Sequence, residues 1–527
     1  MKKYLYQIKG LILLSILLFG VETLITSTLL YLPGRMIDAY VTKDNDISSL
    51  ILMYIGLFSL YLISCYGSNR LADYRRIRFE KNIKKDFFAA VLHREYKDFK
   101  DYEVGEYISM QSNDITEMCQ NYLSPFVSLF RSAIMIIIFG IYMLVLVDAS
   151  ITAVIIACSI ITVFTPLITA ERLAKSNHIY LERLGKYVTK TTAFFDAHAI
   201  FDRKAKKKLE EENDKELEDV YHKFMEFRRV NSLAYVINGG SVEFVSVVTF
   251  IMVAALLFGD HISVGMATTA FMYSTKFTEP IYELNVNIGS IKSVKKIQMK
   301  LTAILNKKPS TDREIIQDCD IIQLSGVKKG FAKTQVLLPD MQLVKGHKYM
   351  IIGPNGIGNS FMLRLLMQHE VADGGTISYD GTAISHLDLD ELVGYLPQNT
   401  LLFNTNYLNN VTLYGTYSGE NLPLYESYFP EKIIAKIKDN PSLINLSGGE
   451  KQVVAIIRSL CMDKAVLLWD EPFSAMNSAC IDYFMSQIHR IPQLIVIVAH
   501  NLNDHMDSFD QVYTVTAAEK ELISQEA

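Results

Sequence analysis

The segment 446-LSGGEKQVVAIIRSLC-461 precedes 465-AVLLWDEP-472 by only a few residues. In the first segment, two adjacent glycines come before an apolar helical pattern, so the turn exposes backbone N–H groups at the start of a helix. The second segment reads as a buried strand, and it ends in the carboxylates of Asp470 and Glu471. Together they predict an α/β domain that holds an oxyanion.

A second glycine-rich turn lies about 90 residues earlier, at 353-GPNGIGNS-360. A short apolar strand, 348-KYMIIG-353, leads into it, and an apolar helix follows over 361–367. This turn fits the phosphate-binding loop pattern at every position but one, because Asn359 stands where the pattern requires a lysine. The residues expected to bind nucleotide here are Gly353, Pro354, Asn355, Gly356, Ile357, Gly358, Asn359, Ser360 and Phe361.

Three further side chains complete a site for a nucleotide triphosphate and Mg²⁺. Ser360 and Asp470 are the expected metal ligands, and Glu471 is positioned to polarise an attacking water. A third predicted strand, 494-LIVIVAH-500, ends in His500, which could contact a γ-phosphate. Two phosphate-binding turns are too many for one self-contained site, so we expect two nucleotides shared across a dimer.

The first 300 residues have a different character. Half of all residues in the 527-residue chain are hydrophobic, 21% are charged, and the mean hydropathy is +0.17. Apolar windows near 11–32, 48–66, 128–148, 150–170, 237–258 and 262–284 are each long enough to cross roughly 30 Å of hydrocarbon. The sequence therefore predicts six membrane spans. The net charge of −5 gives no reason to expect nucleic acid as a partner.

The connections between these windows differ in length. The second and fourth windows are followed by about 60 residues dense in charge, as in 202-DRKAKKKLEEENDKELED-219. Since Lys and Arg near membrane ends favour the cytoplasm, these connections and both termini are expected there. Helical periodicity continues into them, which favours helices that extend from the membrane and pair. The scattered cysteines indicate a reducing compartment rather than a disulfide framework.

Charged residues inside the predicted spans are costly if they face lipid. Glu22 and Glu243 are the most central of them and should face a protein interior or a wet cavity. Either contact with substrate or contact with a neighbouring helix would explain them.

The order and spacing of these motifs resemble the ATP-binding cassette (ABC) transporter family, in its exporter branch. Ser447, Gly448, Gly449 and Glu450 match the family signature, Asp470 and Glu471 the Walker B pair, and His500 the switch histidine. The resemblance implies that Phe331 stacks on adenine and that Gln398 contacts Mg²⁺ and takes part in catalysis. It also implies that 99-FKDYEVGEYISMQSNDI-115 docks on the cassette.

The fold expected from this resemblance is a polytopic α-helical membrane domain fused to an α/β P-loop nucleotide-binding domain. The permease domain should cover residues 1–305, a linker 306–319, and the cassette 320–527. ATP and Mg²⁺ are the implied cofactors, and a second half-transporter subunit, the lipid bilayer and an unidentified transported substrate are the implied partners. We expect a multi-pass protein of a bacterial plasma membrane.

The chain departs from the family pattern mainly in its own phosphate loop. Asn359 in place of lysine makes the Walker A motif degenerate and removes roughly 1.5–3 kcal/mol of phosphate binding. Phe361 replaces a small hydroxylated residue, and Asn477 stands at the aspartate position of the D-loop. Because Glu471, His500 and the signature are intact, a heterodimer with one degenerate ATP site is favoured over a homodimer. Whether Asn359 is natural or engineered is left open.

Two classes of function fit these motifs. The first is an ATP-driven half-transporter that exports a small amphipathic molecule or peptide, and an importer of the same architecture is a variant of it. The second is a nucleotide-gated membrane sensor or regulatory subunit that binds ATP with little turnover, which Asn359 would favour. The sequence identifies neither the substrate nor the direction of transport.

Overall fold

The computed structural model describes residues 1–43, 47–307, 313–330, 334–353, 359–440, 442–499 and 502–519. These divide into two compact units. The first contains Met1–His93 and Tyr102–Lys307; the second contains Arg94–Asp101 and the described residues from Arg313 onward. The predicted domain boundaries remain a prediction, but this division falls inside the expected linker.

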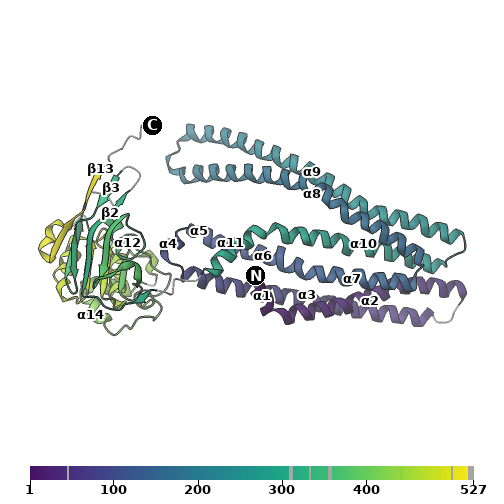
Figure 1. The fold of residues 1–527 in the computed structure, drawn as a ribbon, viewed down its shortest axis with the longest axis horizontal. Helices are drawn as coiled ribbons and strands as arrows, with labels where there is room; N and C mark the ends of the chain where they lie inside the picture. The colour runs from purple at the N-terminus through teal and green to yellow at the C-terminus, as the bar shows by residue number, and fades with distance from the viewer. Residues whose placement is uncertain are drawn as a thin grey trace. The chain divides into compact units, whose positions relative to one another are not determined.

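The first unit is helical throughout its described residues (Figure 1). Its elements are α1 (Lys2–Gln7), α2 (Lys9–Thr42), α3 (Ile47–Leu92), α5 (Val104–Ser109), the π-helical turn η1 (Met110–Asp114), α6 (Ile115–Met118), the π-helical turn η2 (Cys119–Leu123), α7 (Ser124–Leu146), α8 (Ala149–Asp196), η3 (His198–Ile200), α9 (Arg203–Phe258), α10 (Val264–Ser293) and α11 (Lys295–Asn306).

Four helical stretches in the described part of the chain are long and apolar enough to span a membrane. They are Lys9–Thr42, Ile47–Leu92, Val104–Leu146 and Arg203–Phe258. These contain the first, second, third and fifth predicted windows. The fourth window lies on α8, whose described apolar stretch is the shorter Ala149–Thr162, and the sixth lies on α10, which carries Lys276 and Glu279. Six spans therefore remain a prediction.

The longest helices extend far beyond their apolar parts and pair with each other, as the periodicity predicts. Helices α8 and α9 run side by side through the charged segment (Figure 1). Arg183 Nη2 lies 2.8 Å from Glu216 Oε2, and Lys190 Nζ lies 3.0 Å from Glu212 Oε1. The charged run is therefore more than a solvated face, because part of it joins these two helices.

Helix α3 runs antiparallel to α1 and α2, and polar side chains join it to both at a near-constant register. Glu22 Oε2 accepts a hydrogen bond of 3.2 Å from Ser68 Oγ, and Asn82 Nδ2 donates to Gln7 Oε1 at 3.0 Å. Between these pairs the buried Arg75 donates to Ser15 Oγ. Glu22 thus contacts a neighbouring helix within this chain, whereas Glu243 is exposed on α9.

The second unit contains two main sheets and the α/β pattern expected from the sequence. Its elements are α4 (Tyr96–Phe99), β1 (Glu314–Ile315), β2 (Ile321–Gly330), β3 (Thr334–Leu337), β4 (Met341–Val344), β5 (Lys348–Ile352), α12 (Asn359–Leu366), β6 (Gly374–Tyr379), β7 (Thr382–Ala383), η4 (Ile384–His386), β8 (Leu387–Asp388), β9 (Val393–Leu396), α13 (Tyr407–Val411), α14 (Leu422–Glu426), α15 (Glu431–Lys438), η5 (Leu443–Asn445), α16 (Gly448–Cys461), β10 (Val466–Asp470), α17 (Ser478–Met485), η6 (Ile488–Arg490), β11 (Leu494–Val498), η7 (Asn503–Ser508), β12 (Gln511–Thr514) and β13 (Thr516–Glu519).

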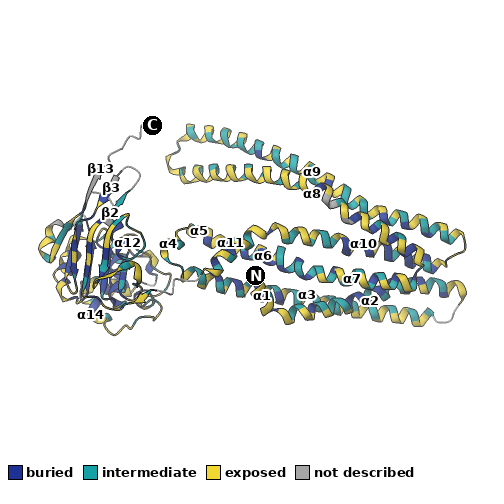
Figure 2. Ribbon diagram, viewed as in Figure 1, coloured by how far each residue is buried: buried dark blue, intermediate teal, exposed yellow. Residues whose placement is uncertain are grey.

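The central sheet is parallel, with strand order β12-β5-β11-β10-β9. Its strands β10 and β11 are buried along their whole length (Figure 2). A second, antiparallel sheet has the order β13-β3-β2-β6-β7, with β4 also paired to β2. Parallel strands of one sheet have their carboxyl ends at the same edge. The ends of β5, β10 and β11 therefore place Gly353, Glu471 and Ala499 at that edge.

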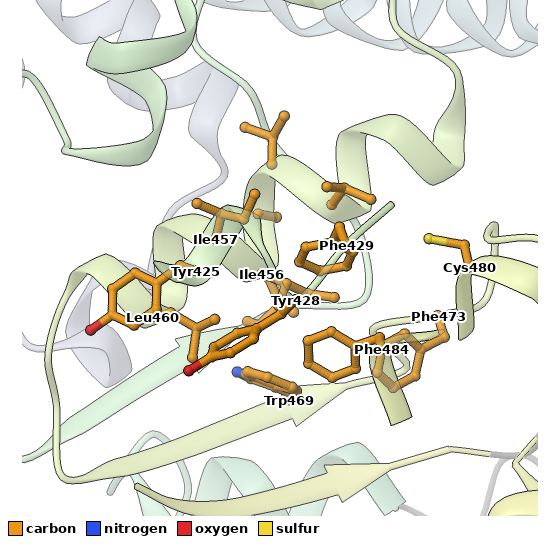
Figure 3. Packing of buried hydrophobic residues seen from close by; sticks show 14 of the residues in the cluster. Tyr425, Tyr428, Phe429, Ile456, Ile457, Leu460, Trp469, Phe473, Cys480 and Phe484 are labelled. Atoms are coloured by element: carbon orange, nitrogen blue, oxygen red, sulfur yellow. The ribbon is translucent and has the colours of Figure 1, made fainter. Parts of the chain in front are cut away.

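Two cores stabilise this arrangement. Helix α12 packs with β2, β4 and one face of the central strands in the first core. The second core lies around α16 and α17, where Phe484 contacts Phe429, Phe473 and Trp469 with ring centroids 5.0, 5.4 and 6.0 Å apart (Figure 3). Phe473 and Trp469 flank Asp470 and Glu471 in sequence, so this aromatic cluster fixes the carboxylate-bearing turn.

The segment predicted to dock on the cassette divides between the two units. Residues 94–101 cluster with the second unit, whereas Tyr102–Ile115 belong to the helical unit. Helix α5 begins at Val104 and continues through η1 and α6 into α7, so residues from Val104 onward are part of a long helical stretch. Docking of 99–115 on a cassette stays a prediction.

Candidate nucleotide site

The carboxylate and hydroxyl predicted to hold Mg²⁺ lie together. Ser360 Oγ, in the first turn of α12, donates a hydrogen bond of 2.8 Å to Asp470 Oδ1 at the end of β10. Asp470 is 4% exposed, and burial raises its pKa above the ordinary range for a carboxyl group. A desolvated carboxylate beside a hydroxyl provides the hard oxygen ligands that Mg²⁺ prefers, so these residues fit that ion.

The second oxygen of Asp470 is held by a residue that the sequence analysis missed. Tyr395 Oη on β9 donates to Asp470 Oδ2 at 3.3 Å. Burial is the largest cause that raises the pKa of this phenol, and the Asp470 carboxylate is the next. Tyr395 lies three residues before Gln398, but nothing in the sequence shows that β9 pairs with β10 and places Tyr395 beside Asp470.

The other predicted catalytic residues are described in part. Glu471 has a φ of 47°, in the left-handed region, and its N–H donates to Val498 O at 2.8 Å. That bond fixes the turn after β10 against the end of β11. Gln398 is exposed, shortly after the end of β9. His500 lies outside the described residues, as do Phe331 and Pro354–Gly358 with Asn355, Gly356 and Ile357 between them.

The remaining residues of the phosphate loop are placed by backbone and core. Asn359 begins α12, and its side chain is not among those described. Phe361 is 2% exposed and packs in the core below α12, so only its backbone is left to face a phosphate. The intact helix start after the turn agrees with the predicted strand–turn–helix order.

The signature residues form the N-terminus of α16. Ser447 is the N-cap and accepts from Glu450 N at 3.4 Å, while Ser447 N donates to Glu450 Oε2 at 2.9 Å. Lys436, paired with Glu450, is the largest cause that lowers the pKa of the Glu450 carboxyl. Ser447 and Gly448 are exposed, so this helix start is open to a ligand.

The two glycines are required by close packing against the turn after Glu471. A Cβ on Gly449 would lie 2.7 Å from Ala475 O, and one on Gly448 would lie 3.0 Å from the Ala475 side chain. Gln452, another residue whose role sequence reasoning missed, joins the same two elements. Its Nε2 donates to Ser474 Oγ at 2.8 Å, and its Oε1 accepts from Ala475 N at 2.9 Å.

Two family profiles match this chain. The profile described as the ABC transporter transmembrane region matches residues 12–281, and the profile described as ABC transporter matches residues 339–474. The first alone covers more than half of the chain. The chain belongs to the ABC transporter family.

Relatives of this ABC protein differ in how much of it they match. The mitochondrial iron–sulfur clusters transporter ATM1 of Gibberella zeae is 27% identical over 306 residues, which covers 53% of this chain and 43% of the relative. A Rickettsia bellii relative, whose name describes an export ATP-binding/permease protein, is 21% identical over 520 residues. That match covers 92% of this chain and 86% of the relative. The chain thus spans less than half the length of the mitochondrial relative that it matches.

The segment Arg94–Asp101 contacts the ABC cassette close to this site. Tyr96 on α4 stacks on His369, with ring centroids 4.1 Å apart and planes 24° apart. Lys100 Nζ lies 3.3 Å from Glu370 Oε1. Burial lowers the pKa of His369 to about 4, and the cations of Lys100 and Arg364 act in the same direction. The imidazole is therefore neutral at physiological pH and packs as an aromatic ring.

Proposed function

We propose that this chain is one half of an ATP-driven exporter that moves a small amphipathic molecule or peptide across a bacterial plasma membrane by alternating access. The main support is the hydrogen bond of Ser360 Oγ to the buried Asp470 carboxylate, at the edge where the parallel strands end. The same chain has helical stretches long and apolar enough to span a membrane. The match along 92% of the chain to a relative named for export supports the direction.

In this proposal Ser360 and Asp470 hold Mg²⁺, which neutralises charge on the β- and γ-phosphates. Glu471, placed by its bond to Val498 O, orients and polarises the attacking water, and Gln398 and His500 act beside it. Ser447, Gly448 and Gly449 provide N–H groups and a hydroxyl for the nucleotide of a partner subunit, while this chain's own nucleotide faces the partner's signature. The cassette and both termini would then lie in the cytoplasm.

We further propose that the partner is a different half-transporter, so that one of two ATP sites is degenerate. Asn359 keeps a neutral amide where a lysine charge would bind phosphate, which weakens only the site built on this chain's own loop. The intact signature completes the other site. A homodimer would contain two weakened sites.

Transport in reconstituted vesicles tests the main proposal. Proteoliposomes that contain the chain and the partner recovered from native membranes should move substrate when given Mg²⁺ and ATP, and Glu471→Gln in this chain together with the matching change in the partner should stop it. Mass spectrometry of the same pull-down identifies the partner and the cargo. Absence of transport with every recovered partner would contradict the proposal.

The sensor hypothesis has one observation in its favour, which is Asn359. Restoring the charge with Asn359→Lys should tighten ATP binding at this chain's own site by roughly 10- to 150-fold, since charge-assisted contacts contribute about 1.5–3 kcal/mol. A half-transporter with one good site already hydrolyses ATP rapidly before this change. A sensor gains most of its turnover from it, so ATPase rates before and after the substitution separate the two.

A further inference from the structure

A line of contacts connects α4 to the carboxylate expected to bind Mg²⁺. Tyr96 stacks on His369, the His369 ring meets the Tyr395 ring edge-on at 6.5 Å and 86°, and Tyr395 Oη donates to Asp470 Oδ2 at 3.3 Å. Asp470 in turn accepts from Ser360 at 2.8 Å. All of these residues belong to the second unit.

Each member of this line is held rigidly. The His369 N–H donates to Arg364 O at 2.9 Å, which ties it to the last turn of α12, and Glu370 pairs with both Lys100 and Arg364. Tyr395 stands on β9, which pairs in register with β10 through Leu468↔Tyr395 and Trp469↔Leu396. Packed rings on rigid elements leave little freedom for one member to move without its neighbours.

Helix α4 lies in the chain between two long apolar helical stretches, so a movement of α4 would reach both of them. Residues 94–101 connect α3, which ends at Leu92, to α5, which begins at Val104. Helix α3 is long and apolar enough to span a membrane, and so is the stretch Val104–Leu146, which begins with α5. A displacement of α4 is therefore passed covalently to two such helices. The known motifs do not include His369 or Tyr395, so the sequence signature of the family does not account for this connection.

We propose that Tyr395 and His369 are positioning residues that couple the orientation of the Asp470 carboxylate to α4. The Tyr395 hydroxyl holds one carboxylate oxygen so that the other stays on Ser360, the pair that would bind Mg²⁺, and the two rings transmit a shift of Asp470 to Tyr96. This inference rests on the proposed ATP-dependent function and adds to it two side chains, Tyr395 and His369, that join Asp470 to α4.

The first test is the dependence of ATP binding on Mg²⁺ in the purified full chain. Trp469 is the one tryptophan of the sequence and directly precedes Asp470, so its fluorescence reports on this carboxylate. Tyr395→Phe removes the hydroxyl but keeps the ring, and it should raise the Mg²⁺ concentration for half-saturation about 10- to 100-fold, as loss of an outer-shell partner does. Tyr513→Phe, which removes another cassette hydroxyl, one that donates to Gln511 Oε1 and not to Asp470, should leave it unchanged.

The second test is hydrogen–deuterium exchange of the Tyr96–Phe99 backbone with and without Mg²⁺ and ATP. Exchange in the wild type should change on nucleotide binding, and the change should disappear in Tyr395→Phe and in His369→Ala. His369→Phe keeps an aromatic ring against Tyr96 and should restore it. A general loss of folding would remove exchange protection throughout the cassette and would not be rescued by this variant.

The results of these two tests can support or overturn the Asp470–α4 coupling independently of the transport proposal. If the wild type moves no substrate but Tyr395 and His369 still govern the α4 response, the coupling stands and the transport proposal fails. Wild-type Mg²⁺ dependence and a wild-type α4 response in both Tyr395→Phe and His369→Ala would overturn the coupling.

Discussion

At the scale of single residues, the site depends on side chains that hold other side chains. Gln452 illustrates this, since it touches no expected ligand yet bridges the signature helix to the turn that follows Glu471. The signature would serve the partner's nucleotide and Glu471 the chain's own. Gln452 therefore stands between the two ATP sites of a dimer.

Replacing Gln452 by leucine should reduce kcat for ATP hydrolysis by about tenfold, because two part-buried hydrogen bonds that position the turn are lost at about 1 kcal/mol each. The KM for ATP should change much less, since no contact to nucleotide is removed. Steady-state ATPase of the assembled complex measures both. Gln487→Leu, at a half-buried glutamine of the same cassette that bonds Ser486 and Arg490, is the matched control, and an equal effect there would contradict the assignment.

Lys348 at the start of β5 is 1% exposed and donates to Gly346 O and Gln493 O, each at 2.7 Å. Burial lowers its pKa to about 8 from the ordinary lysine value. In the unfolded chain this lysine stays protonated up to about pH 10.4. Between these two values the unfolded state binds more protons, so this group contributes stability that rises with pH.

The free energy of unfolding of the wild type relative to Lys348→Met should therefore increase from about pH 8 to about pH 10, and stay constant below pH 7. The comparison cancels other titrating groups, which are common to both proteins. Denaturant unfolding of the full chain, followed by Trp469 fluorescence at several pH values, provides the difference. A flat difference across this range would show that Lys348 titrates normally.

At the scale of elements, the helices of the first unit pack closely where small residues permit it. Gly34 on α2 faces Gly265 on α10, and a Cβ at Gly34 would lie 2.4 Å from Gly265 O. Asp38, one turn later, accepts from Gly265 N at 2.8 Å and Ser263 Oγ at 2.7 Å. The start of α10 is thus fixed to the end of α2 by contact and by hydrogen bonds.

Gly34→Ala should lower the unfolding temperature of the detergent-solubilised protein by several degrees, because overpacking at such a contact costs about 1–3 kcal/mol. Gly20→Ala on the same helix has nothing within 4 Å of the new methyl group and should leave that temperature unchanged or slightly higher. Thermal unfolding of both variants provides the comparison. Equal shifts would mean that α2 and α10 separate to admit the methyl group.

At the scale of the whole molecule, the proposed heterodimer makes this cassette's signature more important for ATP hydrolysis than its own phosphate loop. The chain's own loop carries Asn359, while its signature would complete the partner's stronger site. Substitutions in the signature should then matter more than substitutions at Glu471.

Ser447→Asp keeps an N-cap of equal quality for α16 but sets a negative charge where a γ-phosphate of the partner's nucleotide would lie. In the heterodimer it should reduce ATPase at least tenfold, whereas Glu471→Gln in this chain alone should leave more than half of the activity. ATPase rates of complexes with one altered chain give the ratio. Equal loss from both substitutions would indicate a homodimer or a working site on this chain's own loop.

The sequence by itself determined the class of fold, the order of the motifs and the pairing of Ser360 with Asp470 as the expected metal ligands. Strands 348–353, 465–470 and 494–500 were predictable because buried parallel strands are continuously apolar, and the signature helix because two glycines precede an apolar period. The long paired helices followed from periodicity in the charged segments. These features are local, so neighbouring residues encode them.

Only the tertiary structure decided which side chains serve the site from a distance. Tyr395, His369 and Gln452 act through pairing of β9 with β10, the end of α12 and the packing of α16, all of which join segments far apart in sequence. It also placed Arg94–Asp101 with the cassette. The sequence pattern records how each segment buries its own apolar face, but contacts between segments depend on where the folded chain places them.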